Sequence, residues 1–158
     1  MLYLIRHTDA VDLEPDAARP LSAEGRDQVK RVAAFLRGCG EPPPQEIWHS
    51  PLVRARETAA GLATYLGWKA PLQAVAGLQP EDDPRRLVAR LNAVEHGLAV
   101  IGHNPHLTTL ATLLVTGRDS PPAFTVRKGA VIALEYSGSA ARGWVVQWHV
   151  DADLFGGR

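Results

Sequence analysis

The residues best suited to chemistry follow short apolar segments that lie far apart in the sequence. Arg6 and His7 come directly after the apolar run Leu2–Ile5, and His103 comes one glycine after the run Leu98–Ile101. Apolar runs of this length predict buried strands. Because ligands of open α/β sheets bind just beyond the carboxyl ends of the strands, the pattern indicates a functional site where these two runs end.

Histidine and arginine in one site favour chemistry on a phosphoryl group. Arg6 and Arg54 carry planar guanidinium groups that match two phosphate oxygens and stay charged at any working pH, so they can hold a phosphate and offset the charge on its oxygens in the transition state. A neutral imidazole can attack phosphorus when its other ring nitrogen is held as N–H by a backbone carbonyl. His7 suits this role because it ends a strand beside Arg6.

Two segments, His49–Pro51 and His103–Pro105, repeat the order histidine, capping residue, proline after a strand. Ser50 and Asn104 are predicted to cap the helices that follow, with each proline as the first helical residue. Helix starts of this kind present free N–H groups and a positive dipole end to an anion, and they place Arg54 in or just after the first turn. We interpret the first of the two histidines as a residue at the rim of the site.

The elements that must position these residues alternate between strand and helix. Helices are expected to begin near Ser22, Pro51, Pro84 and Pro105, and strands are expected over residues 2–5, 46–48, 71–75, 98–101, 130–136 and 144–150. This order predicts a three-layer α/β sandwich with a mostly parallel six-stranded sheet flanked by helices. The link Ser137–Gly143 is too short for a crossover, so the last strand is predicted to be an antiparallel edge strand. No linker divides the chain, and we expect residues 1–158 to form a single domain.

Composition excludes several classes of partner. Seventeen basic residues balance seventeen acidic ones, so nothing favours a nucleic acid or an anionic membrane. A single cysteine, Cys39, leaves no intrachain disulfide and suits a reducing compartment. No apolar run approaches membrane-spanning length. We expect a cytoplasmic protein that is a monomer or a weak dimer.

Four motifs, in this order, resemble those of the histidine phosphatase (phosphoglycerate-mutase-like) superfamily. They are Arg6-His7-Thr8, Arg19-Pro20-Leu21-Ser22, Ser50-Pro51-Leu52-Val53-Arg54-Ala55 with Glu57-Thr58-Ala59, and Gly102-His103-Asn104-Pro105. The small size and the Arg-Pro-Leu segment look most like the SixA-type phosphohistidine phosphatases. The resemblance implies that His7 is the nucleophile and becomes phosphorylated. It also implies a phosphate pocket formed by Arg6, Arg54 and His103, with Arg19 joining them.

The resemblance further implies an open site. We expect Arg19, Thr8, Ser50 and Asn104 to contact the substrate. Thr8 stands where the family usually has glycine, and its branched side chain is expected near the phosphate. The chain lacks the cap insertion of larger family members, which suits phosphohistidine carried by a protein as well as a small phosphoester.

Two regions offer a proton donor. Asp16, in the loop before Arg19, is the favoured candidate by similarity to the SixA type, and Glu81, Asp82 and Asp83 are the alternatives. Imidazole is a far better leaving group than an alkoxide, so a dedicated acid contributes less when the substrate is a phosphohistidine.

The leading hypothesis is a metal-independent phosphatase that needs no cofactor and acts on protein phosphohistidine. The second hypothesis is a phosphomonoesterase that acts on small molecules. The third is a regulatory module that binds phosphate but has lost turnover. A mutase is less favoured because the chain has no room for a cap that encloses the substrate. His106, one helical turn after His103, suggests a metal pair, but no third ligand clusters with it in the sequence.

Overall fold

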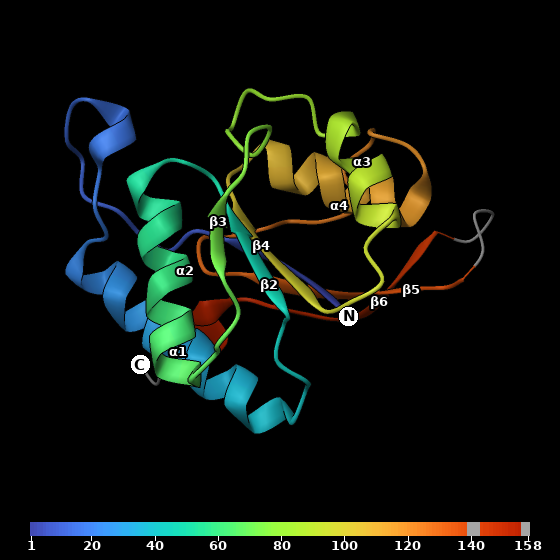
Figure 1. Ribbon diagram of the computed structural model, residues 1–158. Coiled ribbons are helices and arrows are strands. Elements are labelled where there is room, and N and C mark those ends of the chain that lie inside the picture. Colours follow the sequence, from blue (N-terminus) through green and yellow to red (C-terminus); the bar gives the residue numbers. More distant parts are fainter. Residues whose placement is uncertain (139–142, 156–158) are drawn as a thin grey trace.

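The computed structural model describes residues 1–138 and 143–155 of the chain. Its centre is a six-stranded sheet with the order β3-β2-β4-β1-β5-β6 (Figure 1). The strands are β1 (Leu2–Arg6), β2 (Glu46–His49), β3 (Leu72–Ala74), β4 (Leu98–Gly102), β5 (Val131–Tyr136) and β6 (Trp144–Val150). All six predicted strands are therefore present, and residues 139–142 of the predicted turn lie outside the described residues.

The sheet is mostly parallel, as predicted. Strands β1, β2, β3 and β4 pair in parallel, whereas β5 pairs antiparallel with both β1 and β6. The edge strand β6 is thus antiparallel to its neighbour, as its short link requires. The one strand whose direction differs from the other five is β5, one place in from the edge.

Four helices cover the two faces of the sheet and complete the three layers. They are α1 (Ala23–Cys39), α2 (Val53–Leu66), α3 (Arg85–Asn92) and α4 (His106–Thr116), with short 3-10 helices at η1 (Asp16–Ala18) and η2 (Ala152–Phe155). Helices α1 and α2 lie on one face, and α3 and α4 on the other (Figure 1). In the described part of the chain, no helix is long and apolar enough to span a membrane.

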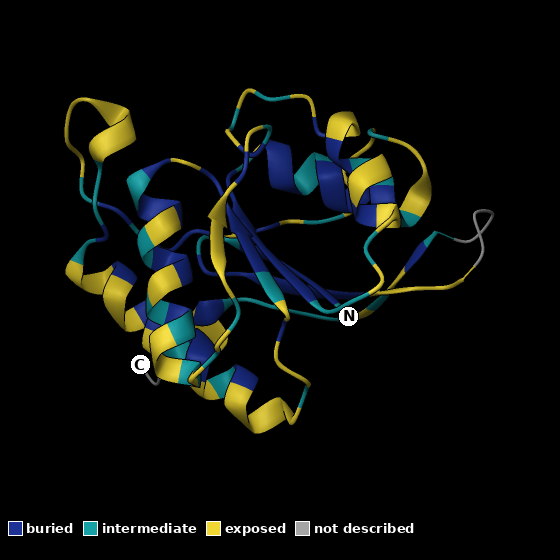
Figure 2. Ribbon diagram, viewed as in Figure 1, coloured by how far each residue is buried: buried dark blue, intermediate teal, exposed yellow. Residues whose placement is uncertain are grey.

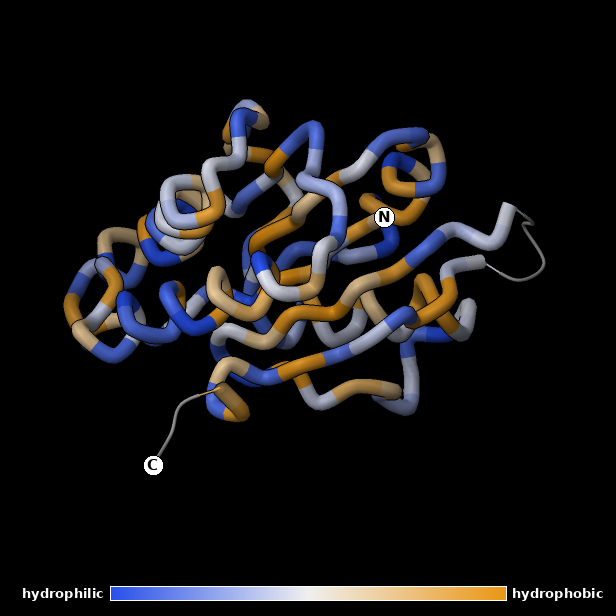
Figure 3. Tube along the Cα trace, turned by 90° about the horizontal axis from the view of Figure 1, so that it is seen from below, coloured by the Kyte–Doolittle hydropathy of each residue, from blue (hydrophilic) through white to orange (hydrophobic). Residues whose placement is uncertain are grey.

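The core is divided by the sheet into two layers. Leu2 and Leu4 of β1 pack toward α3 and α4, while Tyr3 and Ile5 pack toward α1 and α2. This alternation follows from the two-residue period of a strand. Both faces are covered, which is why the central strands are apolar throughout. Figure 2 shows these strands buried between the helices, and Figure 3 shows hydrophobic residues concentrated along them.

Helix α1 begins beside Ser22, as predicted. The Ser22 hydroxyl accepts a hydrogen bond from the Gly25 N–H at 3.0 Å, which satisfies one of the free donors of the first turn. At the other end Gly40 has φ +67°, a left-handed conformation that favours glycine.

The predicted caps of the two helices that face the site were wrong. Helix α2 begins at Val53 and α4 at His106, so Ser50 and Asn104 lie in the turns that precede these helices. The Ser50 hydroxyl accepts from the Leu52 N–H at 3.3 Å, a bond within the turn that delays the helix. Pro51 and Pro105 therefore precede the first helical residue, whereas each was predicted to be that residue.

The strand ends do converge at one edge of the sheet. Arg6 of β1 lies in register with Gly102 of β4, and the N–H of His7 donates to the Gly102 carbonyl at 3.0 Å. On the other side of β4, the N–H of Ser50 donates to the Ile101 carbonyl at 3.0 Å. Three segments that are distant in sequence thus end side by side.

Candidate active site

The His7 ring is held in one tautomer by the backbone. Its Nδ1 lies 2.7 Å from the carbonyl oxygen of Thr8, and because a carbonyl only accepts, Nδ1 carries the proton and Nε2 keeps its lone pair. Burial lowers the pKa of His7 to about 4, aided by the positive charges of Arg54 and Arg6 and opposed by the Thr8 carbonyl. At neutral pH the ring is therefore uncharged, as a nucleophile must be.

His103 faces His7 across the site. The two ring centroids are 4.8 Å apart. The pKa of His103 is lowered to about 3, mainly by burial and to a smaller extent by the nearby His7 and Arg54. Both of its ring nitrogens are buried and bond to no atom of the residues that the structure describes. A neutral imidazole in this position can donate its single N–H to an oxygen of a bound anion.

Both histidines should make the fold sensitive to acid. Their pKa values lie below the ordinary 6.5, so the unfolded chain takes up protons that the folded chain does not. The free energy of unfolding is therefore expected to fall as the pH is lowered from 6.5 toward about 4, by at most about 1.4 kcal/mol per pH unit for each histidine. Urea unfolding at pH 7, 6 and 5 measures the slope. The slope should be smaller in His103→Gln, because the contribution of one histidine is lost. An unchanged slope in this variant would contradict the lowered pKa of His103.

Arg6 is oriented by the loop between α4 and β5. Its Nη1 donates to the carbonyl of Val126 at 2.9 Å, and Nδ2 of Asn104 donates to the same oxygen at 2.8 Å. The Asn104 Oδ1 accepts from the Thr108 hydroxyl at 3.0 Å. Burial lowers the pKa of Arg6, although its guanidinium remains charged at neutral pH. A single carbonyl thus fixes two of the predicted site residues.

Arg54 and Arg19 are joined by Asp16. Arg54 is 5% exposed, and it donates from Nη1 to the Asp16 carbonyl at 3.0 Å and from Nη2 to Oδ2 at 3.1 Å. The other carboxylate oxygen of Asp16 accepts from Arg19 Nη1 at 3.1 Å. Hydrogen bonding to Arg19, with the charge of Arg54, holds the pKa of Asp16 below its usual range. This carboxylate therefore bridges two predicted site arginines and is ionised at neutral pH.

Two of the predicted substrate contacts have buried side chains. Thr8 is 1% exposed, and its hydroxyl lies 3.3 Å from that of Thr58. Ser50 is fully buried in the turn before α2. Arg19 and Asn104, by contrast, are partly exposed. The structure thus brings all predicted site residues to one edge of the sheet. Among them, the side chains of Thr8 and Ser50 are buried below the protein surface.

The alternative carboxylates make other contacts. Asp82 accepts from the Gln79 N–H at 2.8 Å, and Asp83 accepts from the Arg85 N–H at 3.0 Å. Glu81 is exposed. Asp16, the favoured candidate, contacts Arg54, but it is ionised at neutral pH and so has no proton to donate there.

His106 is buried at the start of α4. Across residues 1–138 and 143–155, no three histidine, cysteine, aspartate or glutamate side chains are grouped so that they could hold a metal ion. The suggested pair of His103 and His106 therefore gains no third ligand among these residues.

Sequence reasoning missed an ion pair near His7. Lys128 Nζ lies 2.7 Å from Asp9 Oδ1, and the Ser22 hydroxyl donates to Asp9 Oδ2 at 2.6 Å. The charge of Lys128 contributes to the lowered pKa of His7. Asp9 directly follows the Arg6-His7-Thr8 motif and could have been noticed, but no motif marks Lys128, which comes from the loop before β5.

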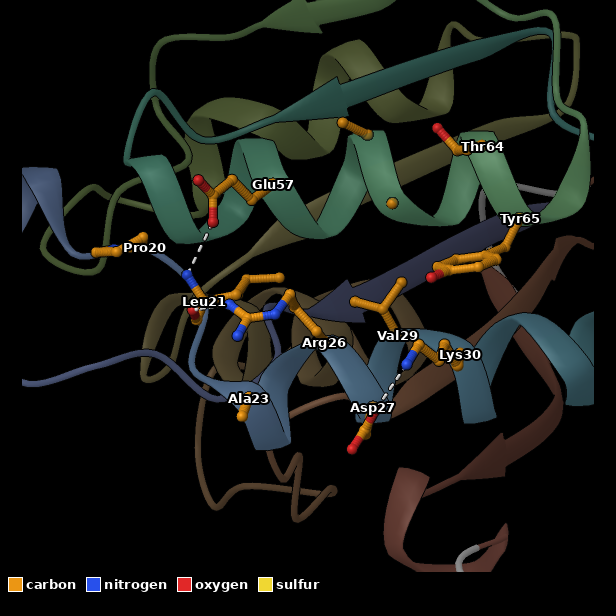
Figure 4. A pocket seen from close by; sticks show the side chains of 12 residues that line it. Pro20, Leu21, Ala23, Arg26, Asp27, Val29, Lys30, Glu57, Thr64 and Tyr65 are labelled. Atoms are coloured by element: carbon orange, nitrogen blue, oxygen red, sulfur yellow. Dashed lines mark hydrogen bonds and ion pairs between the residues drawn. The ribbon is translucent and has the colours of Figure 1, made fainter.

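A groove between α1 and α2 adjoins the Arg19 segment (Figure 4). The N–H of Leu21 donates to the Glu57 carboxylate at 2.8 Å, and Arg26 donates to the Leu21 carbonyl at 2.9 Å. Glu57 therefore fastens the end of the loop that carries Asp16 to α2. The groove is lined by Pro20, Leu21, Ala23, Arg26, Asp27, Val29, Lys30, Glu57, Ala60, Gly61, Thr64 and Tyr65.

Two neutral histidines facing each other, with arginines from β1 and α2, define an α/β protein with a site for a phosphate-like anion. A family model of the histidine phosphatase superfamily (branch 1) matches residues 2–80. The chain is also 30% identical over 148 residues to the phosphohistidine phosphatase SixA of Escherichia coli (strain K12), covering 90% of this chain and 91% of that protein. The chain belongs to the histidine phosphatase superfamily, which confirms the predicted family and the predicted class of enzyme, a phosphatase.

Solved structures confirm the fold. The protein histidine phosphatase SixA complexed with tungstate has a TM-score of 0.86 at 22% identity, covering 98% of this chain and 99% of that one. A putative phosphohistidine phosphatase SixA from Nakamurella multipartitia has a TM-score of 0.78 at 24% identity, covering 95% and 94%.

Proposed function

We propose that the protein is a phosphatase that uses His7 as its nucleophile and acts on phosphohistidine in a protein. The observation that carries the proposal is the hydrogen bond from His7 Nδ1 to the Thr8 carbonyl, which leaves the Nε2 lone pair for attack. The donors that a phosphoryl group needs are supplied by His103, whose ring centroid lies 4.8 Å from that of His7, and by the buried Arg54.

The first step transfers the phosphoryl group to the enzyme. His7 Nε2 forms a bond to phosphorus while the bond from phosphorus to the substrate's imidazole nitrogen breaks. The other nitrogen of the substrate ring carries a proton, so the electron pair leaves with a neutral imidazole. Arg6 and Arg54 offset the charge on the phosphoryl oxygens, and His103 donates a hydrogen bond to one of them. No metal ion is required for this charge compensation.

The second step releases phosphate. Water attacks the phosphorus, the bond to His7 breaks, and His7 leaves as a neutral imidazole. Asp16 is held ionised by Arg19 and Arg54, so its carboxylate can accept the proton of the attacking water. Inorganic phosphate and the free enzyme remain.

The state of Asp16 favours a substrate with a good leaving group. An ionised carboxylate has no proton to give, and an alkoxide needs one to depart, whereas a phosphohistidine whose other ring nitrogen is protonated releases a neutral imidazole without one. The absence of a cap insertion suits a phosphoryl group on the surface of a protein. The relative in Escherichia coli (strain K12), named a phosphohistidine phosphatase, supports the same substrate class.

A comparison of substrates tests the proposal. A carrier protein phosphorylated on histidine and a panel of alkyl and aryl phosphomonoesters are hydrolysed in the presence of EDTA, with and without vanadate. We expect kcat/KM to be highest for the phosphoprotein, with activity that survives EDTA and is blocked by vanadate. Preference for a small ester would indicate a phosphomonoesterase, and phosphate binding without turnover would indicate a regulatory module. Either outcome would overturn the proposal.

Asp16→Asn tests the proposed base of the second step. We expect the labelled phosphoenzyme of the variant to decay about 100-fold more slowly, whichever substrate formed it, because an amide cannot accept the proton of the attacking water. Rapid quenching at successive times after labelling measures the decay. Asp12→Asn, in the same exposed loop, is the control and should leave the decay rate unchanged. An unchanged decay rate in Asp16→Asn would show that Asp16 is not the base.

The proposed unit of function is a single domain of residues 1–158, working in the cytoplasm. Strand β1 lies between β4 and β5, so the sheet needs strands from both halves of the chain. The lone cysteine, Cys39, suits a reducing compartment.

A further inference from the structure

A continuous chain of hydrogen bonds connects the His7 ring with the start of α2. His7 Nδ1 is bonded to the Thr8 carbonyl at 2.7 Å. The N–H of Thr8 donates to the Thr58 hydroxyl at 3.2 Å, and the Thr8 hydroxyl lies 3.3 Å from the same oxygen. The Thr58 hydroxyl in turn donates to the carbonyl of Arg54 at 2.7 Å. These hydrogen bonds thus join the proposed nucleophile to the backbone carbonyl of Arg54.

The position of every proton in this chain follows from chemistry. The Arg54 carbonyl can only accept, so the single hydroxyl proton of Thr58 points to it. The Thr58 oxygen then has two lone pairs, which accept from the N–H and the hydroxyl of Thr8. Thr58 therefore makes all three of the hydrogen bonds that a hydroxyl can make.

Both threonines are closed off from solvent. Thr58 is 0% exposed and Thr8 is 1% exposed, so water cannot replace a lost partner without a rearrangement. A Cβ on Gly129 would lie 3.5 Å from Cγ2 of Thr8, which places the threonine methyl against this glycine. The branched side chain at position 8 is accordingly packed between α2 and the loop before β5.

We propose that Thr58 and Thr8 are positioning residues that set the His7 ring and Arg54 in register with each other. Neither hydroxyl is proposed to contact the substrate. Thr58 lies one helical turn after Arg54 and fixes the carbonyl of that turn, while Thr8 fixes the peptide that orients the His7 ring. The inference rests on the proposed role of His7 and also accounts for a threonine in place of the family's usual glycine.

Substitutions by valine, which keeps the shape and removes the hydroxyl, test this role. In Thr58→Val we expect kcat to fall about 10- to 100-fold and tungstate to bind several-fold more weakly, because Arg54 and His7 lose their common support. Thr58→Ser restores the hydroxyl and should return both values to within about threefold of the original. Thr8→Val should have a smaller effect, about three- to tenfold, because the backbone N–H of residue 8 still bonds Thr58.

A matched control is available in α4. Thr112 is 1% exposed, and its hydroxyl, like that of Thr58, donates to the carbonyl four residues earlier, at 2.8 Å, and accepts from a backbone N–H, that of Ala123, at 3.1 Å. Thr112→Val should lower the melting temperature but leave kcat and tungstate affinity unchanged. If it lowers them as much as Thr58→Val does, the effect is general loss of stability and the positioning role is refuted.

The ring itself gives a readout that stability alone does not move. Nitrogen NMR of the histidine rings should show a fixed Nδ1–H on His7 in the original protein and a mixture of tautomers in Thr58→Val. The double variant Thr8→Val/Thr58→Val should be no worse than Thr58→Val, because both act through one oxygen. An unaltered tautomer with unaltered tungstate affinity in Thr58→Val would overturn the proposal. Neither measurement needs turnover, so a failure of the proposed function would appear separately, as absent hydrolysis by the original protein.

Discussion

Replacing His7 with alanine is expected to abolish turnover and the covalent phosphoenzyme together. His7 holds its Nδ1–H on the Thr8 carbonyl and is neutral at pH 7, so Nε2 is the atom proposed to attack. Alanine has no nucleophilic atom in its side chain, and we expect kcat to fall by about 10,000-fold or more. Rapid quenching with labelled substrate measures the intermediate, which should be labile in acid and stable in base.

His49 provides the control for this experiment. It also follows a strand, is 5% exposed, and has its Nδ1 2.8 Å from the carbonyl of the next residue, Ser50. His49→Ala removes an equivalent buried ring, so it should cost stability while the labelled intermediate still forms. Labelled enzyme in His7→Ala, or its loss in His49→Ala at a temperature where that variant is folded, would show that the nucleophile is misassigned.

Much of this arrangement could be predicted from the sequence. The apolar runs before Arg6 and His103 mark buried strands, and parallel strands must end at one edge, so the meeting of the two histidines follows from the pattern of elements. The cap of α1 at Ser22 could be predicted because its side-chain bond is local. Arg6, His7 and His103 could be predicted for the same reason, because each lies at the end of a strand or just beyond it.

The rest depends on contacts between distant segments. The bond between Asp16 and Arg54 spans 38 residues, and that between Lys128 and Asp9 spans 119, so neither has a signature in local spacing. The helix start after Ser50 was predicted too early because its hydroxyl bonds within the turn. The two long-range bonds share one cause, which is that a polar side chain with several possible partners takes the one that tertiary structure brings to it. The Ser50 hydroxyl instead takes a local partner that competes with the helix cap.

Arg54→Ala is expected to weaken the binding of tungstate or vanadate by about 100-fold, since a buried guanidinium that can donate two bonds to an oxyanion is lost. Arg54 is 5% exposed, so solvent screens its charge little. The tungstate affinity of Arg54→Lys should lie between those of the original protein and Arg54→Ala, because lysine keeps the positive charge but lacks the planar guanidinium group. Calorimetric titration with tungstate at fixed salt measures both variants.

The exposed Arg56, two residues further along α2, separates a local effect from the loss of one positive charge. Arg56→Ala changes the net charge by the same amount, yet it should leave tungstate affinity within about twofold because an exposed charge is screened by solvent and salt. Asp16 adds a second check. Its side chain is 56% exposed, so in Arg54→Ala it stays solvated and the fold should survive. Unchanged tungstate affinity in a folded Arg54→Ala protein would mean that the anion binds elsewhere.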